Sequence, residues 1–129
     1  METPNQLRAT AEQRPWGFYE ILLDAPDCKV KRITVKARHR LSLQRHAYRE
    51  EHWTIVSGNA NVTTGYVTEQ DKRVLDEHNM GPKDTIRIGP GTIHRIEALN
   101  QDVVFIEVQL GTYFGEDDIQ RIEDDFGRE

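Results

Sequence analysis

The sequence has no long apolar run, since no stretch of about 18 residues is both uncharged and apolar, and this excludes a membrane-spanning helix. It contains one cysteine, Cys28, so a disulfide within the chain is impossible. Residues 1–14 lack the apolar stretch of a secretory signal peptide. We therefore expect a reduced, cytoplasmic protein with no membrane partner.

The net charge of −5 is small but unevenly distributed. Residues 115–129 carry seven acidic and two basic side chains, which accounts for the whole of it. Residues 29–49 contain eight basic side chains and no acidic one. Such a strip attracts a small anion or a nucleic acid. None of the helices or aromatic platforms of nucleic-acid-binding modules accompanies it, so we expect a small anionic partner and no nucleic acid.

Short apolar runs separated by Gly, Pro, Asn and Asp predict β structure nearly throughout. We predict nine strands, at Phe18–Leu23, Val30–Lys36, Arg40–Gln44, Glu51–Ser57, Ala60–Val67, Arg73–Asp76, Asp84–Ile88, Ile93–Ala98 and Val103–Leu110. Their number and close turns indicate a small all-β sandwich or barrel. A short C-terminal helix is also predicted, because Ile119, Ile122 and Phe126 recur at a helical period after an acidic start.

Residues 40–46 hold the first candidate functional side chains. Alternation along a strand places the two leucines on one face, and Gln44 and His46 with two further polar residues on the other. If the polar face is the barrel interior, it lines a wet pocket; if not, it is solvated surface, and periodicity leaves both open. Glu51 and His94 add a carboxylate and a second imidazole, which a divalent cation accepts together with an amide oxygen.

The spacing of these residues resembles the two motifs of the cupin superfamily. The first motif has two ligands separated by one residue, then a glutamate, then a glycine, which match Gln44, His46, Glu51 and Gly58. The second has a glycine three residues before a histidine, which matches His94. The resemblance implies a double-stranded β-helix (a jelly-roll barrel). Those two histidines, the glutamate and the glutamine would bind one divalent metal ion, zinc first, with manganese, iron, cobalt or nickel as alternatives.

Three blocks carry a closer resemblance: Arg14–Gly17, Arg40–Ala60 and Phe105–Arg128. They are similar to the cupin domain of type II mannose-6-phosphate isomerases, which often follows a mannose-1-phosphate guanylyltransferase domain in that family. The resemblance covers about residues 14–128 and departs from the family pattern mainly in turns, where loops can absorb change. Because the cupin domain alone is matched here, we expect no nucleotidyl transfer.

The resemblance implies a metal-dependent isomerase that interconverts mannose 6-phosphate and fructose 6-phosphate through an enediol(ate). Such a reaction needs a group that holds the phosphate, an electrophile for the developing oxyanion and a base near the carbons. Two alternatives remain open. One is a non-catalytic metal-binding module for a phosphorylated sugar or sugar nucleotide, and the other is a different enzyme on the same scaffold.

Arginine suits the phosphate, because its planar fork binds two oxygens at once. We predict that Arg40 binds it from the face of the ligands. Arg87 and Arg95 flank the second ligand turn and are predicted to do the same. Arg121, in the block most similar to the family, is the remaining candidate at the catalytic site.

Two residues compete for the role of base. Glu107 interrupts an otherwise apolar strand, and an inward position would raise its pKa toward useful values. Lys31 is the rival, on a strand whose alternation groups it with Ile33 and Val35. Together with Arg121, these two residues form the predicted catalytic set.

One domain is expected from the length of the chain. We predict a flexible N-terminal arm over residues 1–13 and a single cupin domain over residues 14–129. Small β barrels leave an edge strand with unpaired backbone groups. The arm of a second copy can cover that edge, so a homodimer is expected.

Overall fold

The computed structural model describes residues 11–128. The strands in this range are β1 (Ala11–Arg14), β2 (Gly17–Asp24), β3 (Cys28–Val35), β4 (Leu43–Arg45), β5 (Arg49–Ser57), β6 (Ala60–Val67), β7 (Arg73–Met80), β8 (Thr85–Ile88), β9 (Ile93–Ala98), β10 (Val103–Gly111) and β11 (Gln120–Glu123). Within the described residues there is no helix, and hence none long and apolar enough to cross a membrane.

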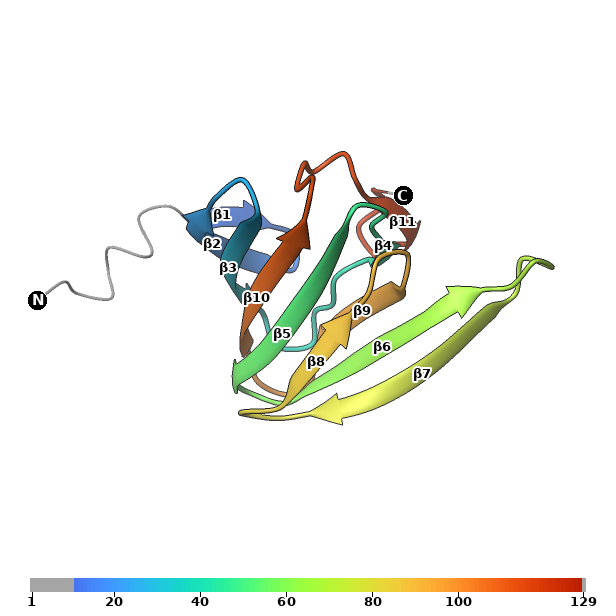
Figure 1. The fold of residues 1–129 in the computed structure, drawn as a ribbon. Coiled ribbons are helices and arrows are strands. Elements are labelled where there is room, and N and C mark those ends of the chain that lie inside the picture. Colours follow the sequence, from blue (N-terminus) through green and yellow to red (C-terminus); the bar gives the residue numbers. More distant parts are fainter. Residues whose placement is uncertain (1–10, 129) are drawn as a thin grey trace, which may run out of the picture.

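The strands form two antiparallel sheets packed face to face (Figure 1). The six-stranded sheet has the order β1-β2-β3-β10-β5-β8, and the five-stranded sheet has the order β11-β4-β9-β6-β7. Strands far apart in sequence are neighbours, because β10 lies between β3 and β5. The all-β class and the two-sheet barrel predicted from the sequence are confirmed.

Apolar side chains fill one end of the space between the sheets. On β5, Trp53 and Ile55 are buried while the intervening Thr54 is exposed, as alternation requires. On β10, Val103 and Phe105 are buried, and the ring centroids of Phe105 and Trp53 are 4.9 Å apart. Burial of each such side chain contributes about 1.5–3 kcal/mol, so this core holds the two sheets together.

The inner face of the six-stranded sheet changes from apolar to polar along its strands. After Phe105, the next two inward positions of β10 are Glu107 and Gln109, and both are buried. Strand pairing places Glu107 opposite Trp53 and Gln109 opposite Glu51 on β5. Buried polar groups cost free energy unless they are paired, so this end of the barrel is where a functional site is expected.

The predicted C-terminal helix is wrong. Gln120–Glu123 form β11, which pairs with β4 so that Arg121 lies opposite Gln44. This pairing satisfies backbone groups that a helix would have satisfied internally. It also turns Ile119 and Arg121 toward the barrel interior, where both line a pocket. The strand pairing with β4 therefore outweighs the helical spacing of the apolar residues.

The predicted N-terminal arm is wrong over residues 11–13. These residues belong to β1, which pairs with β2 from Ala11 opposite Glu20. The four residues of β1 carry no apolar alternation, and their strand conformation comes from the hairpin with β2. Residues 1–10 of the predicted arm lie outside the described residues.

Gly58, the glycine of the first motif, follows β5 with a φ of +83°. A Cβ at this position would lie 2.3 Å from the carbonyl oxygen of Asp102. Gly58→Ala is therefore expected to lower the free energy of unfolding by about 3 kcal/mol, from backbone strain and the clash together. Gly91→Ala is the control, because Gly91 has a φ of +78° but open space around its Cβ position.

The Gly91→Ala variant should lose about 1–2 kcal/mol, the strain alone. Urea denaturation of both variants measures the difference. Equal losses of stability in the two variants would show that the close approach of the Asp102 carbonyl to Gly58 does not contribute.

Candidate metal centre and its pocket

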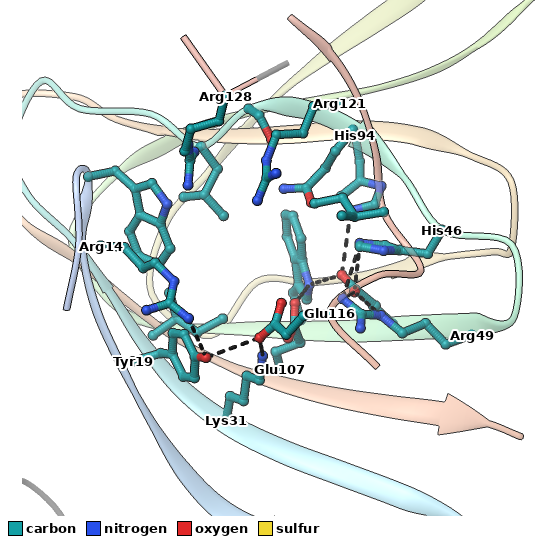
Figure 2. A pocket seen from close by; sticks show the side chains of 18 residues that line it. Arg14, Tyr19, Lys31, His46, Arg49, His94, Glu107, Glu116, Arg121 and Arg128 are labelled. Carbon is teal, nitrogen blue, oxygen red and sulfur yellow. Dashed lines mark hydrogen bonds and ion pairs between the residues drawn. The ribbon is translucent and has the colours of Figure 1, made fainter. Parts of the chain in front are cut away.

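One pocket opens into the polar end of the barrel, lined by side chains of both sheets (Figure 2). The lining comes from β1, β2, β3, β4, β5, β9, β10 and β11, together with neighbouring loop residues and Arg128 near the C-terminal end. Every predicted metal ligand and both predicted bases lie in it: Gln44, His46, Glu51, His94, Lys31 and Glu107. Strand pairing thus gathers residues that are far apart in the sequence.

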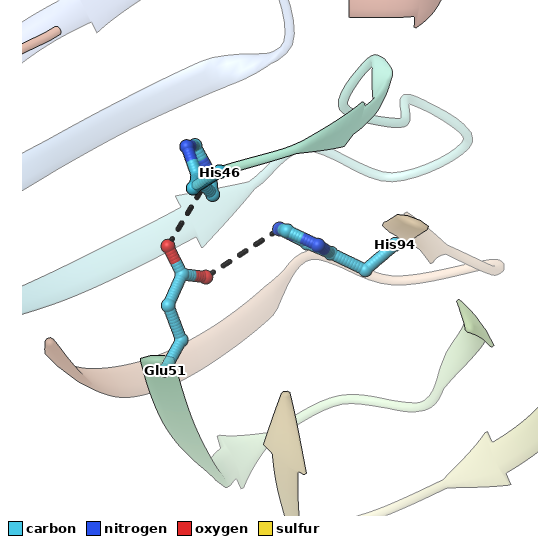
Figure 3. A group of neighbouring side chains, drawn as sticks. All are labelled: His46, Glu51 and His94. Atoms are coloured by element: carbon cyan, nitrogen blue, oxygen red, sulfur yellow. Dashed lines mark ion pairs between the residues drawn. The ribbon is translucent and has the colours of Figure 1, made fainter. Parts of the chain in front are cut away.

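Three of the predicted ligands form a compact buried group. His46 follows β4, Glu51 lies on β5 of the other sheet and His94 is the second residue of β9. The Nε2 atom of His46 is 3.4 Å from one carboxylate oxygen of Glu51, and Nε2 of His94 is 3.5 Å from the other (Figure 3). One ligand atom from each residue lies within 4.8 Å of the others, so the group can hold a metal ion.

Gln44, the fourth predicted ligand, lies beside this group. It is opposite His94 in the pairing of β4 with β9, and its side chain is buried in the same pocket. The strand register therefore places the Gln44 amide next to His94. Ligation by this amide stays a prediction.

Both imidazoles turn the lone pair of Nε2 toward the centre of the group. Nδ1 of His46 is 2.6 Å from the carbonyl oxygen of Asp118, and Nδ1 of His94 is 2.9 Å from that of Thr92. A carbonyl can only accept, so each Nδ1 carries the proton and each Nε2 is the acceptor. Burial lowers the pKa of both histidines to about 4, which keeps them neutral near pH 7.

The donor set fits a divalent metal. Two imidazole lone pairs and a carboxylate face one another, and three acceptors repel unless a cation or a proton donor lies among them. Two nitrogen ligands and one oxygen ligand suit zinc as well as manganese, iron, cobalt or nickel. The carbonyls that hold Nδ1 orient both rings for ligation through Nε2.

Arg49 is a residue of this site that the sequence analysis missed. Its Nε donates to Glu51 at 2.9 Å, and its Nη2 donates to Nε2 of His46 at 3.1 Å. The side chain is buried in the pocket. A signal for it exists in the sequence, because Arg49 and Glu51 are two apart on one strand and so share a face.

Glu107 is buried close to the ligand group. Nε1 of Trp53 donates to its carboxyl at 3.1 Å, and Nε2 of Gln109 donates at 2.7 Å. Burial, followed by the nearby charge of Glu51, raises the pKa of Glu107 to about 7. The positive charge of Lys31, which lies opposite Glu107 on β3, acts to lower this pKa. The inward position of Glu107 agrees with the one predicted from its place in the strand.

Lys31 faces the same pocket but is held by other groups. Its Nζ is 3.7 Å from a carboxylate oxygen of Glu116 and 4.2 Å from the ring centroid of Tyr19. The Tyr19 hydroxyl in turn lies 3.1 Å from Glu116. An ammonium held by a carboxylate and an aromatic face is suited to binding an anion more than to accepting a proton.

The raised pKa of Glu107 predicts a pH-dependent stability. The folded protein binds a proton near pH 7 that the unfolded chain binds only near pH 4.5. The stability contributed by this group is complete below pH 4.5 and is lost as the pH rises through 7. In buffer that contains a chelator, the Glu107→Gln variant is therefore expected to be about 3 kcal/mol more stable than wild type at pH 8.

That advantage should shrink toward pH 4.5, and chemical denaturation across the range measures it. Glu116→Gln is the control: although burial opposes it, Lys31 and the Tyr19 hydroxyl lower the pKa of Glu116. Replacement of the Glu116 carboxylate should therefore bring no gain in the free energy of unfolding at pH 8. A Glu107→Gln effect that is constant with pH would contradict a titrating Glu107.

Three arginines predicted to bind phosphate lie away from this pocket. Arg40 pairs with Asp125 at 2.7 Å, Arg87 pairs with Glu50 at 2.9 Å, and Arg95 is buried against Glu123 at 3.0 Å. Their side chains are not among those that line the pocket of the ligand group. Arg95 lies outside the pocket because side chains alternate along a strand, so the residue after the inward-facing His94 must face outward. For Arg40, the irregular residues between it and β4 break the alternation.

Other arginines take their place at the pocket. Arg14, Arg121 and Arg128 all line it, and Figure 2 shows Arg121 pointing toward its centre. Arg128 is paired with Asp124 at 2.8 Å, and Arg14 donates to the Tyr19 hydroxyl. Nε of Arg121 is buried and has no acceptor among the described residues. It is therefore the pocket arginine best placed to bind an anion.

Comparison with known proteins points to one family. A family model described as mannose-6-phosphate isomerase C-terminal matches residues 3–124. Xanthan biosynthesis protein XanB of Xanthomonas campestris pv. campestris (strain B100) is 44% identical over 116 residues, 89% of this chain and 23% of that protein. A mannose-1-phosphate guanylyltransferase of Klebsiella pneumoniae is 39% identical over the same share of each chain. The chain spans less than a quarter of the length of these relatives.

Solved structures share the fold. The capsular polysaccharide assembling protein CapF of Staphylococcus aureus matches with a TM-score of 0.74 and 20% identity, over 88% of this chain and 34% of that one. Oxalate decarboxylase of Bacillus subtilis matches with a TM-score of 0.73 and 20% identity, over 90% and 31%. Both are cupins, and at this identity the likeness shows the jelly-roll fold alone.

Proposed function

The chain belongs to the family of mannose-6-phosphate isomerase C-terminal domains, and we propose that it interconverts mannose 6-phosphate and fructose 6-phosphate. The observation that carries this proposal is Glu107, a buried carboxyl with a pKa near 7 in the same pocket as the His46–Glu51–His94 group. A base that titrates near neutrality, next to an electrophilic site, is what an aldose–ketose isomerisation requires.

Glu107 is the proposed base. Its carboxylate removes the proton from C2 of the aldose, which gives an enediolate, and the resulting carboxyl returns the proton to C1 of the ketose. The proton on the C2 hydroxyl moves to the oxygen of C1, so the isomerisation is balanced without a redox partner. Trp53 and Gln109 hold the carboxyl in place during both transfers.

His46, Glu51 and His94 would hold the metal, with Gln44 as the fourth ligand, and zinc is our first choice for the ion. When bound, a divalent ion acts as a Lewis acid that stabilises negative charge on the sugar oxygens. The three residues are buried and so are shielded from bulk solvent. This shielding lowers the local dielectric constant, which strengthens electrostatic interactions there.

Arg121 is the proposed phosphate ligand, and its replacement gives a specific expectation. Arg121→Ala should raise KM for mannose 6-phosphate by about 10- to 100-fold, because a charged hydrogen bond to the substrate is worth about 1.5–3 kcal/mol. Arg87→Ala should leave KM unchanged, since Arg87 is exposed and paired with Glu50 outside the pocket. A steady-state assay compares them, and a larger effect of Arg87→Ala would overturn the assignment.

The function is tested on purified protein that is stripped with chelator and reloaded with one metal at a time. We expect a coupled assay to show turnover of mannose 6-phosphate, and His46→Ala to lack it. Absence of turnover in a folded, metal-loaded protein would contradict the proposal. If that protein still binds mannose 6-phosphate in a calorimeter, the non-catalytic module becomes the better function.

A further inference from the structure

Arg49 engages two of the three candidate metal ligands with one guanidinium. Nε donates to the carboxylate of Glu51 at 2.9 Å, and Nη2 donates to Nε2 of His46 at 3.1 Å. The side chains of Arg49, Glu51 and His46 are all more than nine-tenths buried. A protein cation therefore lies at the group where the metal is proposed to bind.

The contact with His46 is incompatible with ligation of that residue. Nδ1 of His46 carries the ring proton and donates to the Asp118 carbonyl, so Nε2 has the single lone pair of the ring. This lone pair accepts a hydrogen bond from Arg49 or binds a metal ion, and cannot do both. A guanidinium and a divalent cation at the same nitrogen would also repel each other strongly.

We propose that Arg49 is an internal competitor of the metal: its guanidinium occupies the His46–Glu51 edge of the group in the metal-free protein and leaves His46 when a divalent ion binds. The proposal rests on the metal centre of the proposed function. Without metal, Arg49 keeps the buried Glu51 carboxylate paired, so the metal-free protein stays folded. With metal, the displaced guanidinium remains in a pocket that also contains Glu107 and Glu116.

A competitor and a supporting residue predict opposite effects on metal affinity. If Arg49 only oriented Glu51 for the metal, its removal would weaken binding about 10- to 100-fold. If Arg49 competes, Arg49→Leu tightens binding about 10-fold or more, since a unit charge at the site is removed. The sign of the change therefore separates the two roles.

The experiment is calorimetric titration of Zn²⁺ and Mn²⁺ into chelator-stripped wild type, Arg49→Leu and Arg121→Leu. Arg121→Leu is the matched control: it removes the same charge from the same pocket, and among the described residues Arg121 makes no hydrogen bond or ion pair with His46, Glu51 or His94. We expect tighter binding in Arg49→Leu and a smaller change in Arg121→Leu. Thermal melting gives a second readout. Stripped Arg49→Leu should melt below stripped wild type, and added metal should raise its Tm by more.

If stripped Arg49→Leu is unfolded, Arg49→Gln replaces it, because the neutral amide retains a donor for Glu51. Equal or weaker metal binding in the neutral variant overturns competition while leaving the metal centre intact. An equal gain in Arg121→Leu also overturns it, because general electrostatics would then suffice. No binding by any of the proteins overturns the metal centre and this proposal together.

Discussion

Glu51→Gln is expected to abolish stoichiometric metal binding and to lower kcat/KM for mannose 6-phosphate by about 10³-fold or more. Glu51 is the one carboxylate in the three-residue group, and both of its oxygens face an imidazole nitrogen. The amide keeps the shape of the side chain but removes the negative charge that balances a dication. Loss of several kcal/mol of transition-state stabilisation corresponds to the expected fall in rate.

Glu50→Gln is the matched control for this substitution. Glu50 is the neighbouring residue, faces outward by alternation and pairs with Arg87 and His52 outside the pocket. Elemental analysis should find one metal ion per chain in wild type and Glu50→Gln, and much less in Glu51→Gln. Full metal occupancy in Glu51→Gln, with the fold intact by circular dichroism, would remove Glu51 from the ligand set.

The candidate ligand group could be predicted through its resemblance to the cupin motifs, because strand alternation alone leaves open which face points inward. Alternation along short strands assigns Gln44 and His46 to one face, and the spacing of Glu51 and His94 matches a known motif. The structure then brings all four into one pocket, because β4 pairs with β9 and faces β5 across the barrel.

The prediction that Arg40, Arg87 and Arg95 line the pocket is wrong, because residues close in sequence need not be close in space. Arg121 is a candidate only through the family resemblance. Arg95 is adjacent to His94 and for that reason lies on the opposite face of β9. Arg121 reaches the pocket only because β11 pairs with β4, a contact between residues far apart in the chain. No local pattern contains that pairing.

The acidic C-terminal segment shows why periodicity misled the prediction of a helix. Its acidic residues satisfy partners in the barrel and in the segment itself, and no helix terminus is involved. The carboxylate of Asp118 accepts the backbone N–H groups of Ala47 and Tyr48, while its carbonyl holds the ring of His46. The segment therefore helps to orient His46, a candidate metal ligand, and the predicted helix concealed this contact.

Glu107→Gln is expected to lower kcat by about 10²- to 10⁴-fold, the usual contribution of a positioned general base. Metal content and KM should change little, because Glu107 lies outside the three-residue ligand group. Solvent deuterium exchange provides a direct readout of proton transfer. Wild type should exchange the proton at C2 of mannose 6-phosphate, and the variant should not.

The pH dependence of kcat/KM shows which protonation state of Glu107 is active. The base acts as a carboxylate, so kcat/KM for wild type should rise with pH and level off once Glu107 has lost its proton. Because a bound cation favours the charged form, the rise should lie at or below the pKa of about 7. Glu116→Gln is the matched control, since it removes another carboxyl of the same pocket and should retain deuterium exchange.

A Glu107→Gln variant that keeps its turnover within about tenfold of wild type would place the base elsewhere. Lys31→Met would then be the next substitution, since Lys31 lies opposite Glu107 on the neighbouring strand. The substitution at Glu107 carries a second expectation that a merely structural residue would not share. At pH 8 the metal-free variant should be more stable than metal-free wild type, and the metal-loaded variant should be nearly inactive, because the buried charge that destabilises the fold is the one that removes the proton.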